Sequence, residues 1–106
     1  MVSAGKAPWV ISASDPPVAL EIRLPKQTVV LAWNQFVHAE GDGEEVRIAF
    51  ASHAVVIKGS GLDPLLPAIA NHRVVSLRQS ARSERFSGYA GRFIRDITVR
   101  RLEGDL

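Results

Sequence analysis

The segment from Val46 to Leu62 constrains the fold of this chain more than any other, because it alternates apolar residues with small or charged ones. It reads V-R-I-A-F-A-S-H-A-V-V-I-K-G-S-G-L. Neighbouring side chains of an extended strand point to opposite faces, so a period of two places one apolar row on one side of a sheet. The members of that row are Val46, Ile48, Phe50, Val55 and Ile57. The segment therefore predicts two strands joined at Ser52-His53.

Other parts of the chain carry the same signal. Further strands are expected over 18–24, 28–40, 73–79 and 93–102, with a hairpin loop over 40–45. In the first of them Val18, Leu20, Ile22 and Leu24 are expected to face inward, and Val75 and Leu77 are expected to do so in 73–79. The alternation changes phase near Trp33-Asn34, where a bulge, a bend or a short turn is expected.

One short helix is expected over 63–71, after the Gly59-Ser60-Gly61 break. Asp63 is placed to cap the first turn, and Pro64 suits the first helical position, where its missing N–H costs no bond. Leu65, Leu66, Ile69 and Ala70 are expected on one face. Asn71 is expected to end the helix in a left-handed conformation.

These elements predict a mainly β fold, either a small antiparallel barrel or a two-layer sandwich of five to seven strands with the single helix. At 106 residues the chain is expected to form one core. Residues 1–17 contain Pro8, Pro16 and Pro17 and are expected to form a flexible N-terminal arm, which Trp9 could attach to the body or to another copy. Residues 18–106 are expected to form a single β-rich domain.

Composition excludes several classes of protein. The sequence holds no cysteine, which excludes disulfides and thiolate sites. No apolar run approaches the ~18 residues of a membrane span, and Pro8 and Ser12 interrupt any signal-peptide core. A cytoplasmic location and no membrane partner are therefore expected.

Charge is distributed unevenly along the chain. Up to His72 there are five Lys and Arg against seven acids, whereas from Arg73 onward eight arginines face four acids. Arginine presents a planar fork of donors that suits phosphate and carboxylate. The arginines fit either an anionic partner or a strand face that needs charge for solubility, and the sequence leaves both open.

Motifs for catalysis and for metal binding are missing from the sequence. His38, His53 and His72 have no zinc-ligand spacing, and the acids near Gly41 and Gly43 do not follow the calcium-loop pattern. No G-x-S-x-G or phosphate-binding glycine motif occurs. The chain is expected to be no enzyme and to need no metal or other cofactor.

Arginines and aromatic residues interleave between residues 85 and 95, as in surfaces that hold single-stranded nucleic acid by stacking and phosphate contacts. The residues are Arg85, Phe86, Tyr89, Arg92, Phe93 and Arg95. The alternative interpretation places Phe86 and Phe93 in the core.

The segment from Val55 to Leu62 also resembles the second signature segment of Sm-like RNA-binding barrels, an apolar strand that ends in a basic residue and a glycine. That resemblance implies a ring-forming barrel in which Lys58 contacts RNA. The first signature of the family, its leading helix and its short closing strand have no counterpart in this sequence.

Two functions follow as expectations. The first is a non-catalytic binding or assembly module that acts through a homo-oligomeric interface. It is based on Trp9, Trp33 and a final strand with apolar residues on both faces, which together exceed what one sheet face would hide. The alternative is RNA or single-stranded DNA binding by an Sm-like barrel through Lys58, Arg85, Tyr89, Arg92 and Arg95.

Overall fold

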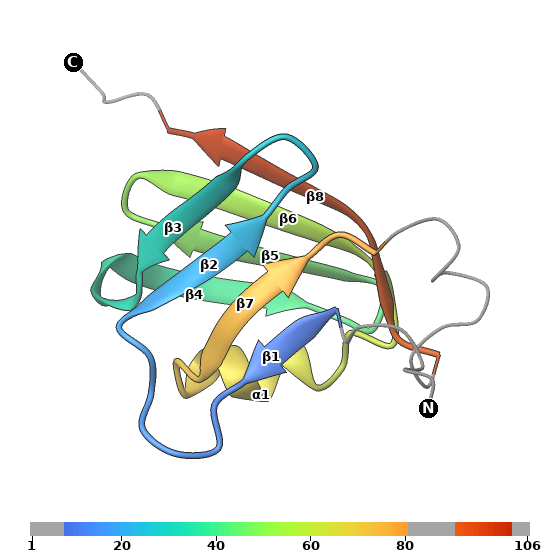
Figure 1. Ribbon diagram of the computed structural model, residues 1–106, viewed down its shortest axis with the longest axis horizontal. Helices are drawn as coiled ribbons and strands as arrows, with labels where there is room; N and C mark the ends of the chain where they lie inside the picture. Colours follow the sequence, from blue (N-terminus) through green and yellow to red (C-terminus); the bar gives the residue numbers. More distant parts are fainter. Residues whose placement is uncertain (1–7, 81–90, 103–106) are drawn as a thin grey trace.

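The computed structural model describes residues 8–80 and 91–102, which form two four-stranded sheets packed face to face (Figure 1). Sheet A contains, in spatial order, β1 (Trp9–Ile11), β7 (Val74–Arg78), β2 (Ala19–Arg23) and β3 (Thr28–Ala32). Sheet B contains β4 (Phe36–Gly41), β5 (Glu45–Phe50), β6 (His53–Ser60) and β8 (Phe93–Arg101). The expected mainly β class is confirmed, and of the two architectures the sandwich is the one observed.

The sheets differ in strand direction. All neighbours in sheet B are antiparallel, whereas in sheet A β2 and β7 run parallel, so the expectation of a purely antiparallel fold is wrong for this pair. The described residues form eight strands rather than five to seven. One additional strand is β1, and the other arises because the expected strand over 28–40 is divided into β3 and β4.

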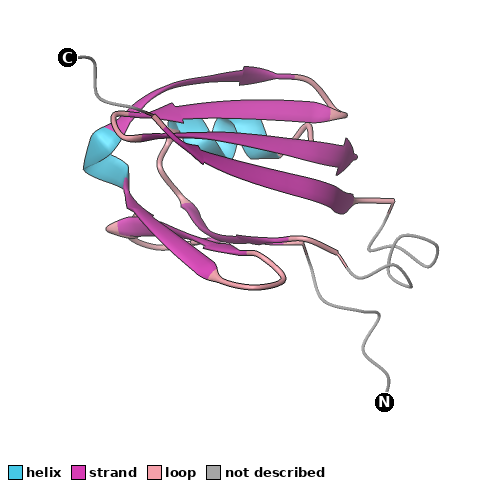
Figure 2. Cartoon of the chain, turned by 90° about the horizontal axis from the view of Figure 1, so that it is seen from above, coloured by secondary structure: helices cyan, strands magenta, loops and turns pink. Residues whose placement is uncertain are grey.

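The core lies between the two layers seen in Figure 2 and follows the predicted alternation of β5 and β6. The five apolar residues of that row are each at most 1% exposed. Burying an aliphatic or aromatic side chain of this size contributes about 1.5–3 kcal/mol, so this row holds sheet B against sheet A.

The phase change near Trp33-Asn34 is a 3-10 turn, η1 (Trp33–Gln35), which leads the chain from one layer to the other at the left of Figure 2. Trp33 is 3% exposed, and its indole Nε1 donates a hydrogen bond of 3.1 Å to the carbonyl of Val74. Its ring stacks on His72 with centroids 5.0 Å apart and also contacts Phe36 and Phe50. Trp33 therefore ties η1 to both sheets.

The expectation of a flexible arm over 1–17 is wrong at Trp9–Ile11. These residues form β1, an antiparallel edge strand that pairs with β7, and Trp9 belongs to the core cluster. Attachment to the body, one of the two roles considered for Trp9, is the role observed. Burial of a large aromatic ring outweighs the disorder that the flanking prolines favour.

Two inward assignments are wrong. Val18 precedes β2 and is 86% exposed, whereas Leu20 and Ile22 are buried as expected. The second is Val75 in β7, which is only half-buried. The buried residues of β7 are Val74 and Leu77, because a register shift against β1 offsets the alternation.

The helix α1 (Leu65–Ala70) is shorter than expected, and both of its ends differ from the prediction. Pro64 occupies the N-cap position, no side-chain hydrogen bond caps the first turn, and Asn71 has a φ of −96°. The left-handed residue is His72, with a φ of 55°. Leu65, Ala68 and Ile69 are the buried residues of the helix.

The glycine segment before the helix is also arranged differently. Strand β6 continues through Gly59 to Ser60, and the residue that turns the chain is Gly61, with a φ of 65°. Glycine at 59 is needed because the backbone of β8 lies against it, since a Cβ there would lie 2.0 Å from the carbonyl oxygen of Phe93.

Candidate functional site

Lys58, the residue that the Sm-like resemblance singles out, is exposed on the outer face of sheet B near the end of β6. The strand register places Glu45 of β5 opposite Lys58 on one side and Asp96 of β8 opposite it on the other. Cross-strand pairs of opposite charge stabilise a sheet. Lys58 therefore lies between acidic residues on both neighbouring strands, which lowers the local positive potential that an anionic ligand would meet.

Arg95 shares a shallow depression with Lys58 beside the β4–β5 hairpin. The depression has a volume of about 350 Å³ and is lined by Asp42, Glu44, Glu45, Lys58, Gly59 and Arg95. Of these described side chains three are acidic and two are basic, so the described part of the lining does not concentrate positive charge. Phosphate binding generally needs such a concentration.

Of the remaining predicted nucleic-acid residues, Arg92 alone belongs to the described part of the chain, and it is not among the residues that line this depression. Arg92 is exposed beside Gly61, because a Cβ on that glycine would lie 2.8 Å from the Cγ of Arg92. Arg85 and Tyr89 lie outside the described residues. The structure thus brings Lys58 and Arg95 together and places Arg92 nearer the turn that leads to α1.

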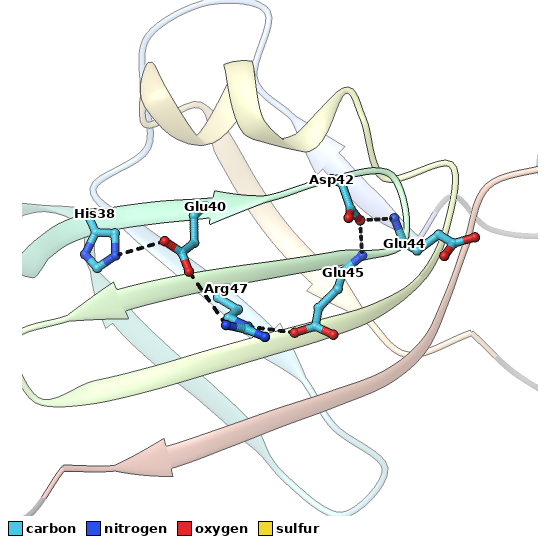
Figure 3. A network of polar contacts seen from close by, with 6 residues as sticks. All are labelled: His38, Glu40, Asp42, Glu44, Glu45 and Arg47. Carbon is cyan, nitrogen blue, oxygen red and sulfur yellow. Dashed lines mark hydrogen bonds and ion pairs between the residues drawn. The ribbon is translucent and has the colours of Figure 1, made fainter.

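A network of charged side chains covers the neighbouring part of sheet B (Figure 3). The Arg47 guanidinium contacts Glu45 at 2.7 Å and Glu40 at 3.6 Å, and His38 lies 4.0 Å from Glu40. The hydrogen bond and charge of Glu45 raise the pKa of Arg47 above its usual value. All of these groups lie near water, where ion pairs add little to stability, so the network makes this face polar rather than rigid.

The acids of the β4–β5 hairpin have a structural role. The Asp42 carboxylate accepts hydrogen bonds from the backbone N–H groups of Glu44 at 2.8 Å and Glu45 at 3.0 Å, which closes the turn. These two donors lower the pKa of Asp42. Within residues 8–80 and 91–102 no three His, Asp or Glu side chains converge as metal ligands.

The outer face of sheet A carries more exposed apolar side chains, although the Glu21–Arg23 ion pair also lies on it. Four apolar side chains beside or on it are at least 40% exposed, namely Val10, Ile11, Val18 and Val30. The register aligns Val10, Ser76, Glu21 and Val30 as one row across the four strands. Exposed apolar area that is contiguous on a surface is one of the properties that mark an interaction site.

The expectation that Trp9 and Trp33 supply exposed apolar surface is wrong. Trp9 and Trp33 are 8% and 3% exposed, so neither offers apolar surface to another copy. Strand β3 takes their place, a segment that sequence reasoning missed as a site. It is an edge strand without charge, proline or glycine, and only its position in the sheet makes that composition unusual.

None of the helices in the described residues is long and apolar enough to cross a membrane. Comparison with known protein families, with curated proteins and with solved structures finds no match to this chain.

Proposed function

We propose that this chain is a non-catalytic assembly module that associates with copies of itself through sheet A. The observation that carries the proposal is the contrast between the two outer faces. Sheet B presents the ion pairs of Arg47 and the alternating charges around Lys58, whereas sheet A presents exposed valines and an edge strand without charge. Depletion of charge is typical of the core of an interface.

Sedimentation velocity over a micromolar to near-millimolar range tests this function directly. A mass that rises from one copy toward two or more with concentration is the expected result. A single monomeric species at every concentration would contradict the proposal, because the exposed valines of sheet A would then have no partner of their own kind.

Nucleic-acid binding is a second candidate, favoured by the exposed arginines of the last strand. Arg92 precedes β8, and Arg95, Arg100 and Arg101 lie on it, all exposed. Binding of this kind releases counterions from the nucleic acid, so the affinity for a mixed oligonucleotide should fall steeply with salt. The variant R100A/R101A should lower both the affinity and the salt slope, and absence of binding at low salt would remove this candidate.

A further inference from the structure

We propose that two copies of this chain pair β3 against β3 in an antiparallel arrangement about a two-fold axis at Val30, which makes one continuous eight-stranded sheet. The inference is based on the proposed self-association and specifies the interface. The direction of the backbone N–H and C=O groups of β3 supports this pairing.

The hydrogen bonds of the β2–β3 hairpin determine which groups of β3 are already paired. The N–H of Leu24 donates to the carbonyl of Gln27 at 2.8 Å, and the N–H of Trp33 donates to the carbonyl of Val18 at 3.0 Å. Antiparallel pairs alternate between bonded and non-bonded positions, so residues 27, 29, 31 and 33 bond toward β2. The N–H and C=O groups of Thr28, Val30 and Ala32 therefore point away from sheet A.

Thr28, Val30 and Ala32, whose backbone groups point away from sheet A, are arranged symmetrically about Val30. A two-fold axis there pairs Val30 with Val30 of the second copy, Thr28 with Ala32 of the second copy and Ala32 with Thr28 of the second copy. All three pairs are of the hydrogen-bonded kind, so complete pairing forms about six backbone hydrogen bonds. Addition of a strand to an exposed edge is an established mode of protein recognition, in which the backbone bonds supply affinity.

The charges around β3 permit this arrangement. Thr28, Val30 and Ala32 are uncharged, and the nearest acid of the same row is Glu21 on β2, which itself contacts Arg23 at 2.9 Å. With strands about 4.8 Å apart, the two copies of Glu21 lie about 14 Å from each other. That distance exceeds the ~8 Å screening length at physiological ionic strength, so their repulsion is weak.

The three other edges carry features that discourage strand addition. Edge β1 has only three residues. Edge β4 carries His38 and Glu40 and has α1 packed beside it. Short length, charge and coverage by another element are the usual means of protecting an edge.

Edge β8 is protected by charge and by the chain itself. It carries four charged residues, Arg95, Asp96, Arg100 and Arg101. The Ser80 hydroxyl accepts from the N–H of Ile94, and the side-chain oxygen of Gln79 accepts from the N–H of Ile97. Among the described edges, β3 alone combines five residues with no charge, proline, glycine or bulge.

A thiol at position 30 tests the pairing, because the sequence contains no cysteine. Hydrogen-bonded antiparallel partners have Cα atoms about 5.5 Å apart, within the usual disulfide range of about 4.4–6.8 Å. Val30→Cys should form a covalent dimer rapidly under mild oxidation. Val37→Cys is the matched control, because Val37 is an edge-strand valine with the same 61% exposure, and it should remain largely uncrosslinked.

Charge substitution gives an independent measurement. Val30→Lys places two ammonium groups opposite each other and should raise the dimer dissociation constant by about 100-fold or more, whereas Val37→Lys should leave it unchanged. Val30→Pro removes an N–H that bonds nothing within sheet A and should weaken the dimer by about tenfold or more. Circular dichroism of each variant establishes that the fold is retained.

The outcomes separate this inference from the proposed function. A wild-type chain that stays monomeric overturns both the proposed function and the β3 pairing. The β3 edge would then be available only to a strand of a different protein. A wild-type dimer that survives Val30→Lys and leaves Val30→Cys uncrosslinked keeps the assembly function and overturns the β3 pairing. If Val37→Lys rather than Val30→Lys dissociates the dimer, the interface is β4 and the pairing is again overturned.

Discussion

Replacement of Gly59 by alanine tests how closely β6 and β8 approach each other. The register between the two strands shifts between Lys58 and Gly59, and at this bulge the backbone of β8 lies against the glycine. An added Cβ would meet the Phe93 carbonyl oxygen at 2.0 Å and the Ile94 Cα at 3.0 Å. Carbon and oxygen in contact normally lie about 3.3 Å or more apart, so the β8 backbone must move by about 1 Å.

The expected cost follows from this displacement. Overpacking a well-packed region destabilises a protein by about 1–3 kcal/mol, and the upper end applies because both obstructing atoms belong to the backbone. Alanine also restricts the conformations of the unfolded chain, which stabilises the folded state by about 0.4–1 kcal/mol relative to glycine. Gly59→Ala should therefore lower the free energy of unfolding by about 2 kcal/mol, which corresponds to roughly 10 °C in Tm for a domain of this size.

The assay is urea unfolding at one fixed protein concentration, followed by the fluorescence of the buried Trp9 and Trp33. Gly91→Ala is the control, because Gly91 has a φ of 75° and nothing lies within 4 Å of its Cβ position. That variant meets only the left-handed backbone penalty of about 1–2 kcal/mol, partly offset in the unfolded state. A Gly59→Ala loss under about 0.5 kcal/mol, or one smaller than that of Gly91→Ala, would refute the close-contact argument.

Three further predictions concern the core and the hairpin loop. Trp33→Phe should cost about 2 kcal/mol in urea unfolding, because the Val74 carbonyl loses its indole donor, and an unchanged midpoint would contradict that role. Leu20→Ala should cost about 3–5 kcal/mol while Val18→Ala stays within about 0.5 kcal/mol of wild type, and equal losses would show that the inward assignments on β2 are wrong. Because hydrogen bonds lower the folded pKa of Asp42 below its ordinary 3.8, its ionised form stabilises the folded chain above that pH, and the benefit is lost as pH falls through the folded pKa. The stability difference between wild type and Asp42→Asn should thus be present at neutral pH and vanish in acid, and a difference that grows in acid would reverse this assignment.

Local periodicity predicts much of the fold. The strands β5 and β6 and the turn at Trp33 follow from side chains that alternate about an extended backbone, and the hairpin between β4 and β5 follows from its glycines and acids. The errors arise where a distant strand changes a local pattern. The register shift between β1 and β7 moves Val75 out of the core, and the packing of Trp9 turns an expected arm into a strand.

The candidate site is less predictable, because its properties depend on neighbours across the sheets. The spacing around Lys58 gives no sign of the acids that the register places on both sides of it. In the same way T-V-V-L-A reads as an ordinary strand until its position at the end of sheet A is known. Edge or interior position is determined by the whole topology rather than by the residues of the strand.

The position of β7 between β1 and β2 has a consequence for biosynthesis. Trp9 pairs with Leu77 and Glu21 pairs with Ser76, so β1 and β2 acquire their shared neighbour only after nearly three quarters of the chain has been made. Contacts so distant along the chain slow folding, because a long loop must close before they form. A nascent chain released before Arg78 would carry the β2–β3 hairpin with both sides unprotected, a hazard that a chaperone or rapid completion of synthesis would have to limit.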